Sequence, residues 1–148
     1  MAYTNRISED MYPLVRYDAD SQGISATTSA YVSMRDYHRG WLLIQVGEMQ
    51  ATATLDISLL QATTTAGAGT KVFAPVKAIT QLTQAAGDGD QIVCIEVQSS
   101  EFDVDGGFDC VAVVSTVAAA AVELSWVFFG CVTRFKETPT TNWEEIVA

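Results

Sequence analysis

Residues 54–71 read TLDISLLQATTTAGAGTK, and the first half of this stretch decides the fold class. Leu55, Ile57 and Leu59 alternate with polar residues, so one face of the segment is apolar and the other is polar. An apolar period of two is the pattern of a half-buried β-strand. The small residues that follow, up to Lys71, are then expected to form the loop of a hairpin.

The two glycines before Lys71 raise the question of a nucleotide site. A phosphate-binding P-loop has the pattern G-x-x-x-x-G-K-[ST] and opens a helix. Here Gly67 and Gly69 stand too close together, Thr70 precedes the lysine, and the next segment has the composition of a strand. Because no helix N-terminus is aimed at an anion, we interpret this segment as a loop tip.

The strand pattern continues along most of the chain. Further candidate strands are rich in β-branched and aromatic residues and are separated by Gly-, Asp- and Ser-rich turn signals; they lie at 27–34, 41–49, 71–84, 91–98, 108–118 and 123–135. Pro75 is expected to break the segment at 71–84, because proline cannot donate a ladder hydrogen bond. The sequence therefore predicts an all-β chain: an antiparallel β-sandwich or a jelly-roll-like barrel of about seven strands.

Both ends of the chain are predicted to be extended arms. Residues 1–26 show no sustained period and are expected to form an N-terminal arm, residues 27–136 the β-sandwich domain, and residues 137–148 a C-terminal tail. Apolar residues on both arms suggest that they clasp a neighbouring subunit; the alternative is that they fold back on their own domain. The candidate partner-binding residues are Met11, Tyr12, Leu14, Tyr17, Trp143 and Ile146.

Two of the candidate strands, at 108–118 and 123–135, are apolar on both faces. A strand with a single buried face would alternate apolar and polar residues. We therefore expect something to cover the second face of these strands, either a neighbouring subunit or the N-terminal arm.

Length and charge limit the classes of function. A chain of 148 residues is large enough for one domain with a real core. The formal net charge is −10, and residues 85–110 contain seven acidic residues and no Lys or Arg. This balance repels phosphate backbones and anionic lipid surfaces, so no nucleic-acid partner is expected.

No signal peptide or membrane span is expected. The N-terminal residues lack a basic start followed by an apolar core. Residues 111–132 are long enough to cross a bilayer, but Glu123 interrupts them and their β-branched and aromatic residues fit two strands. The three cysteines lie in apolar runs without C-x-x-C spacing, which favours buried free thiols in a reducing compartment.

The segment DVDGGFD, residues 103–109, is a weak candidate for a calcium loop. Asp103, Asp105 and Asp109 could supply the several oxygens that calcium requires. The EF-hand pattern D-x-[DN]-x-[DN]-G fails, however, because Gly107 stands at the fifth position. We interpret the segment as a tight turn and expect neither a bound metal nor a cofactor.

An enzyme is the weaker class. Nucleophilic catalysis needs a base beside the nucleophile, and the one histidine, His38, lies between Arg35 and Arg39 in a predicted loop. The acidic residues cluster at predicted loops, where solvation explains them. We therefore expect a protein without enzymatic activity.

The middle of the chain carries a set of spaced motifs. They are a Q-A-x-x-x-x-G-x-G-x-K segment, a K-x-I-T-Q-L-T stretch and an E-x-D-V-x-x-G-F-x-x-V-x-V run, with Gln61, Ala62, Lys71, Lys77, Asp103, Gly107 and Phe108 in place. From Leu59 to about Ala118, the chain resembles a family of small tailed-phage virion proteins. The resemblance implies a β-sandwich in the head or neck of the particle.

The resemblance also implies a function. We expect a virion structural protein, most simply a capsid decoration or cement protein that is assembled in the host cytoplasm and stabilises the head. Its partners would be the major capsid protein or other virion proteins, and it would form a homo-oligomer, with a trimer favoured. Two alternatives stay open: a ring component of the neck or tail, and a calcium-dependent carbohydrate-binding β-sandwich.

Overall fold

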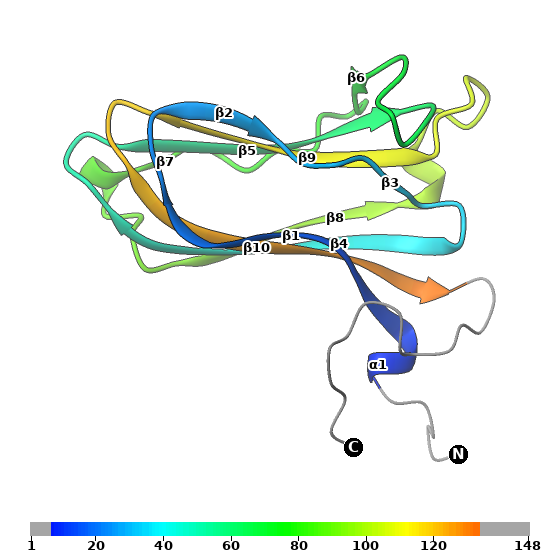
Figure 1. Cartoon of the computed structure of the whole chain (residues 1–148), viewed down its shortest axis with the longest axis horizontal. Coiled ribbons are helices and arrows are strands. Elements are labelled where there is room, and N and C mark those ends of the chain that lie inside the picture. Colours follow the sequence, from blue (N-terminus) through cyan, green and yellow to red (C-terminus); the bar gives the residue numbers. More distant parts are fainter. Residues whose placement is uncertain (1–6, 134–148) are drawn as a thin grey trace.

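A computed structural model describes residues 7–133 of the chain, which form two antiparallel β-sheets stacked face to face (Figure 1). Sheet A has the strand order β1-β10-β4-β8, with the bounds β1 Met11–Gln22, β10 Val122–Thr133, β4 Tyr37–Met49 and β8 Ile92–Gln98. Sheet B has the order β2-β9-β5-β6, with β2 Ser25–Thr28, β9 Cys110–Ala118, β5 Thr54–Ala62 and β6 Lys71–Val72.

Short elements complete the described part. Strand β3 pairs with β9, and strand β7 pairs with β5. Three single turns of helix are also present; the bounds of these five elements are β3 Val32–Ser33, β7 Leu82–Thr83, α1 Ile7–Asp10, η1 Gln84–Ala86 and η2 Ser99–Glu101. In residues 7–133 no helix has the length and apolar character that a membrane-crossing helix needs.

The strand order is that of a long hairpin rolled into two layers. Strand β1 pairs with β10, β2 and β3 with β9, β4 with β8, and β5 with β6 and β7, so that successive pairs alternate between the sheets. The pairings of β10 with β4 and of β9 with β5 then complete each sheet. With β2/β3 and β6/β7 each counted as one interrupted strand, this is the eight-stranded jelly roll. The predicted all-β antiparallel fold is confirmed.

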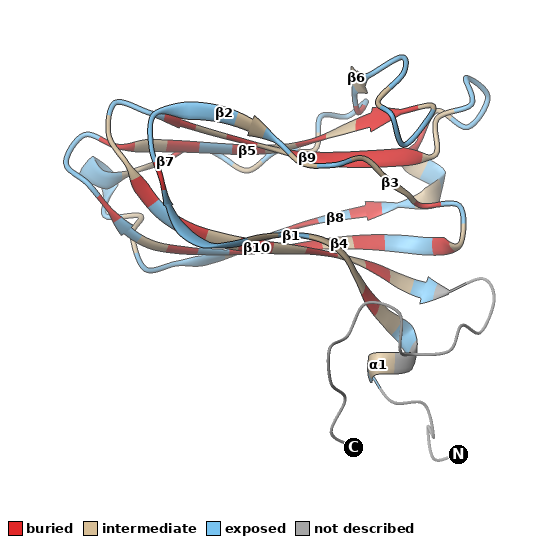
Figure 2. Ribbon diagram, viewed as in Figure 1, coloured by how far each residue is buried: buried red, intermediate tan, exposed pale blue. Residues whose placement is uncertain are grey.

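The core lies between the two sheets. Leu55, Ile57 and Leu59 are at most 1% exposed, as their alternation predicts, and they face the inner residues of β10 and β4. Buried residues alternate with more exposed ones along the strands of both sheets (Figure 2). In β8 the inner residues are Val93, Ile95 and Val97, again as predicted.

The predicted N-terminal arm requires correction. Most of it is β1, an edge strand of sheet A paired with β10. Tyr12 is 1% exposed, and Leu14 and Tyr17 pack against the core. Tyr17 also stacks on Trp126 with ring centroids 6.0 Å apart. These side chains stabilise their own domain, so the boundary predicted at residue 26 lies inside the sandwich. Met11, half-buried, lies on the outer side of the strand beside Cys131.

The segment predicted as one strand at 71–84 is irregular. The only strands in this segment are β6 and β7, and both pair with β5. Between them, an isolated bridge joins Ala78 to Ser58 of β5. Pro75 follows β6 closely, where the sequence predicts the break. Phe73 leaves the sheet to enter the core, where its ring packs edge-to-face with that of Phe102, with the ring centroids 4.9 Å apart.

Candidate functional site

One group of motif residues gathers where β6 meets the turn at 103–109. The Lys71 ammonium donates a hydrogen bond to the Asp103 carboxylate and lies 3.9 Å from the centre of the Phe108 ring. The buried Gln61 accepts a hydrogen bond from the Asp103 backbone N–H over 3.0 Å and donates to the Val72 carbonyl over 3.3 Å. These contacts join the irregular strand to the turn, so the motif residues have a structural task.

A second ion pair joins the segment between β6 and β7 to η2. Lys77 Nζ donates to Glu101 Oε1 over 2.5 Å, and the other carboxylate oxygen of Glu101 accepts from the Gln98 N–H over 2.7 Å. Partial burial raises the pKa of Glu101, but the hydrogen bonds from Lys77 and Gln98 outweigh it, and the pKa lies below its ordinary value. The pair therefore fastens the loop before β7 to η2.

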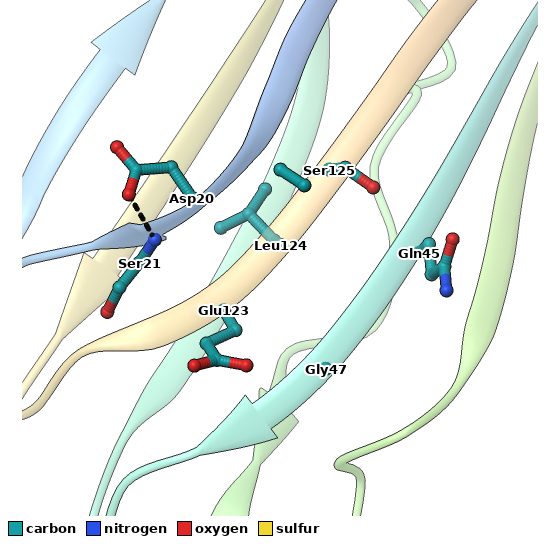
Figure 3. A pocket seen from close by; sticks show the side chains of 8 residues that line it. Asp20, Ser21, Gln45, Gly47, Glu123, Leu124 and Ser125 are labelled. Carbon is teal, nitrogen blue, oxygen red and sulfur yellow. Dashed lines mark hydrogen bonds between the residues drawn. The ribbon is translucent and has the colours of Figure 1, made fainter.

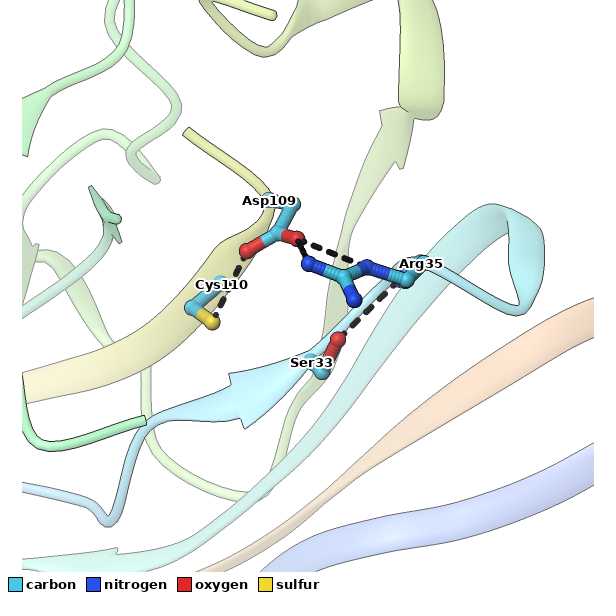
Figure 4. Close-up of polar contacts among 4 residues, drawn as sticks. All are labelled: Ser33, Arg35, Asp109 and Cys110. Carbon is cyan, nitrogen blue, oxygen red and sulfur yellow. Dashed lines mark hydrogen bonds and ion pairs between the residues drawn. The ribbon is translucent and has the colours of Figure 1, made fainter. Parts of the chain in front are cut away.

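The three aspartates of the weak calcium candidate are engaged separately. Asp103 binds Lys71 and accepts a hydrogen bond from the Gly106 N–H over 3.0 Å; these two contacts, in that order, lower its pKa. Asp109 forms an ion pair with Arg35, whose Nη2 lies 3.0 Å from its carboxylate (Figure 4). The side chain of Asp105 is exposed.

These aspartates do not converge on one point. Within residues 7–133, no group of three or more His, Cys, Asp or Glu side chains is placed to hold a metal ion. The segment is a tight turn that depends on its glycines: Gly107 has a positive φ of 80°, and a Cβ on Gly106 would lie 2.7 Å from the Asp103 carboxylate.

The thiols differ in their surroundings. Cys110 is buried, and burial, followed by its hydrogen bond to Asp109 over 3.2 Å, raises its pKa to about 11. Cys131 is half-buried, and burial, followed by the charge of Glu96, also raises its pKa to about 11. Cys94, expected to be buried, is exposed, because it lies on the outer face of the edge strand β8. All three cysteines are free.

His38 lies in β4 rather than in a loop. Its side chain is exposed, and Arg39 follows it on the same strand.

The outer face of sheet A is apolar at one end. Trp41 and Leu43 of β4 lie beside Phe129 and Val127 of β10, all half-buried, and the Trp41 ring stacks on Phe129 with centroids 5.7 Å apart. This is the second apolar face predicted for the strand at 123–135. The outward position of Trp41 follows from its pairing register with β10.

A groove of about 320 Å³ lies in this apolar end, and we call it the outer groove. It extends across all four strands of sheet A, and its walls include Met11, Arg39, Trp41, Glu96, Cys131 and Val132. Val132 is 48% exposed. The groove lies beside the last described residues of the chain, so residues 134–148 begin at its edge.

The opposite end of the same face is polar. A hollow of about 470 Å³ lies there, and its lining includes Asp20, Gln45, Gly47 and Glu123 (Figure 3). Gly47 leaves room for Glu123, because a Cβ at position 47 would lie 3.2 Å from the Glu123 Cβ. Acidic and amide groups therefore line one end of the outer face, while aromatic and aliphatic groups, with Arg39 and Glu96 among them, line the other.

The comparisons with known proteins found structural likeness only. No family model and no curated protein matches the chain. A chain of the Triatoma virus structure is similar with 12% identity and a TM-score of 0.45, over 90% of this chain and 68% of that one. The tobacco streak virus coat protein is similar with 6% identity and a TM-score of 0.36, over 86% of this chain and 87% of its own. At such TM-scores the fold assignment rests on the strand order of the chain itself.

Trp143 and Ile146, the remaining candidate partner-binding residues, lie outside the described residues. Their role stays a prediction, as does the resemblance to tailed-phage virion proteins.

Proposed function

We propose that the chain is a non-enzymatic structural protein of a virus particle. Its more specific role is that of a capsid decoration or cement protein of a tailed phage, which binds the major capsid protein as a homo-oligomer, most simply a trimer. The eight-stranded jelly roll is a frequent fold of viral capsid domains, but lectins and cupins share it. Fold alone therefore does not assign the function, and the surface has to support the choice.

The observation that carries the proposal is the apolar end of the outer face of sheet A. Trp41 and Leu43 of β4 and Val132 of β10 are left partly exposed there, in a chain with a net charge of −10. An apolar surface bordered by polar groups is typical of a protein–protein contact. The remaining acidic surface keeps the free protein soluble before assembly.

Three ion pairs give most of the calcium candidates a structural role. Lys71, Lys77 and Arg35 are each bound to a carboxylate that holds a loop in place. Those carboxylates belong to Asp103, Glu101 and Asp109, so two of the three calcium candidates serve the fold. Within residues 7–133, no observation favours the carbohydrate-binding alternative.

Binding to shells tests the proposal. Capsid shells of the virus that encodes the chain, stripped of accessory proteins, are mixed with increasing amounts of the purified protein and sedimented. We expect saturation at a copy number proportional to that of the major capsid protein, and a higher temperature of shell disruption. Saturation at a few copies per particle would assign the chain to the neck or tail instead. Absence of cosedimentation would contradict a decoration role.

A further inference from the structure

We propose that the outer groove binds the C-terminal segment of a second copy of this chain, with Trp143 and Ile146 as the anchoring side chains. The inference rests on the proposed function, because it names the partner of the same apolar surface. It also assigns a task to the candidate partner-binding residues of the C-terminal tail.

The groove has the size and chemistry of a receptor for one aromatic side chain. Its volume of about 320 Å³ lies at the lower end of the ~300–1,000 Å³ range of pockets that hold ligands. Trp41 contributes a flat aromatic wall, and Met11 and Val132 contribute aliphatic surface. Aromatic residues that fill such pockets are typical anchors of protein interfaces.

The length of the remaining chain fits this site. Residues 134–148, fifteen residues, follow β10 at the edge of the groove. An extended chain advances at most ~3.3–3.6 Å per residue, so Trp143, ten residues after Thr133, can lie up to about 35 Å away. The segment is therefore long enough to extend beyond its own copy.

The groove contains one cationic side chain, Arg39, together with the carboxylates of Asp10 and Glu96. Residues 7–133 contain five Lys and Arg residues, and four of them form ion pairs with carboxylates: Arg16, Arg35, Lys71 and Lys77. Arg39, exposed at the groove, forms none within this part of the chain. In the segment, Glu144 and Glu145 stand between Trp143 and Ile146. A carboxylate beside the aromatic anchor would meet the free guanidinium.

The direction of β10 favours a second copy over the same one. Strand β10 runs from Val127 and Phe129, beside Leu43 and Trp41, to Cys131 and Val132 at the groove, so a chain that continued in the same direction would leave the groove behind. The segment of the same copy would have to reverse direction before Trp143 entered the groove. In a closed cyclic oligomer, each segment can instead continue onto the next copy.

Photo-crosslinking in an isotopically mixed sample tests the source of the occupant. The full chain carries p-benzoylphenylalanine in place of Trp143, and equal amounts of ¹⁴N and ¹⁵N protein are unfolded, mixed and refolded together. We expect crosslinks to peptides that contain Trp41, Glu96 or Cys131, about half of them joining a light to a heavy peptide. Crosslinks that join only peptides of one label would show that the segment binds its own copy. Crosslinks to other surfaces would also overturn the proposal.

A charge reversal provides a second readout in the full-length protein. Arg39→Glu is expected to raise the dissociation constant of self-association at least about tenfold. When Glu144→Arg and Glu145→Arg are added to the same chain, the dissociation constant is expected to return to that of the natural sequence. Arg16→Glu, at an exposed cation of sheet A that pairs with Val127 but does not line the groove, is the matched control and should leave the constant within about twofold. Equal effects of Arg39→Glu and Arg16→Glu would overturn the proposal. The proposed function would still stand if stripped shells bound both variants as they bind the natural chain.

Discussion

Ser115 donates a hydrogen bond to the side-chain oxygen of Gln22 over 2.9 Å, and both residues are buried. They are 93 residues apart in the sequence. The Gln22 amide also donates to the Ser115 carbonyl over 3.3 Å and to the Ser25 carbonyl over 3.2 Å. The end of β1, in sheet A, is thereby tied to the centre of β9, in sheet B.

Removal of the Ser115 hydroxyl should therefore destabilise the sandwich. Ser115→Ala leaves the buried Gln22 oxygen without its donor, which costs about 1–3 kcal/mol of the free energy of unfolding. Urea denaturation followed by circular dichroism measures the change. Ser125→Ala, on the outer face of sheet A, should stay within about 0.5 kcal/mol. Equal small effects of the two substitutions would show that the Gln22 contact contributes nothing to stability.

The edge strand β1 should be essential for folding. Tyr12→Ala removes a fully buried ring and is expected to cost about 3–5 kcal/mol, the range for large aromatic truncations. Deletion of residues 1–22 should abolish the cooperative thermal transition, because it exposes the inner residues of β10. Arg16→Ala on the same strand is the control, since its ion pair with Asp18 is exposed and worth at most about 1 kcal/mol. A cooperative transition in the deletion variant would mean that β1 is an arm after all.

Acid should weaken the attachment of the turn at 103–109. The pKa values of Asp103 and Glu101 are lower in the folded chain than their ordinary values. Between the folded pKa of each carboxyl and its ordinary value, the unfolded chain binds more protons than the folded one. The stabilisation is therefore fully present above about pH 5 and falls as the pH drops through the folded pKa. Asp103→Asn should flatten the dependence of the melting temperature on pH in this window. Asp105→Asn, at the same turn but exposed, should leave the slope unchanged; the opposite ranking would refute the assignment.

Thiol reactivity should single out Cys94. It is exposed, whereas Cys110 and Cys131 have pKa values of about 11, so only about one part in a thousand of each is thiolate at pH 8. Ellman's reagent at pH 8 should titrate one thiol rapidly in the native protein and all three after unfolding. Cys94→Ser should remove the rapid phase. A rapid phase that persists in this variant would contradict the described burial.

The central strands could be predicted from the sequence because their environment is regular. Leu55, Ile57 and Leu59 alternate with polar residues and face the core, so the period of two predicts both the strand and its buried face. Strand β1 escaped prediction because its register with β10 shifts between Pro13 and Val15 and again between Tyr17 and Asp20. Each shift displaces the alternation by a residue, so no sustained period survives in the sequence.

The site could be predicted only in part. The sequence motifs single out Lys71, Lys77 and Asp103, but they do not predict the ion pairs that these residues form. The two ion pairs join residues 32 and 24 positions apart in the chain, so they depend on the fold. The outer groove gathers side chains from four strands, and one sequence does not give their order. One signal was present: the strand at 123–135 is apolar on both faces, and its outer face forms part of the apolar surface.

The most direct test of the proposed structural role is the solution mass of the full-length protein, measured by light scattering on a sizing column over a range of concentrations. A closed oligomer, most simply a trimer, whose mass does not grow with concentration is the predicted result. A protein that stays monomeric at every concentration would contradict self-assembly through the outer face of sheet A.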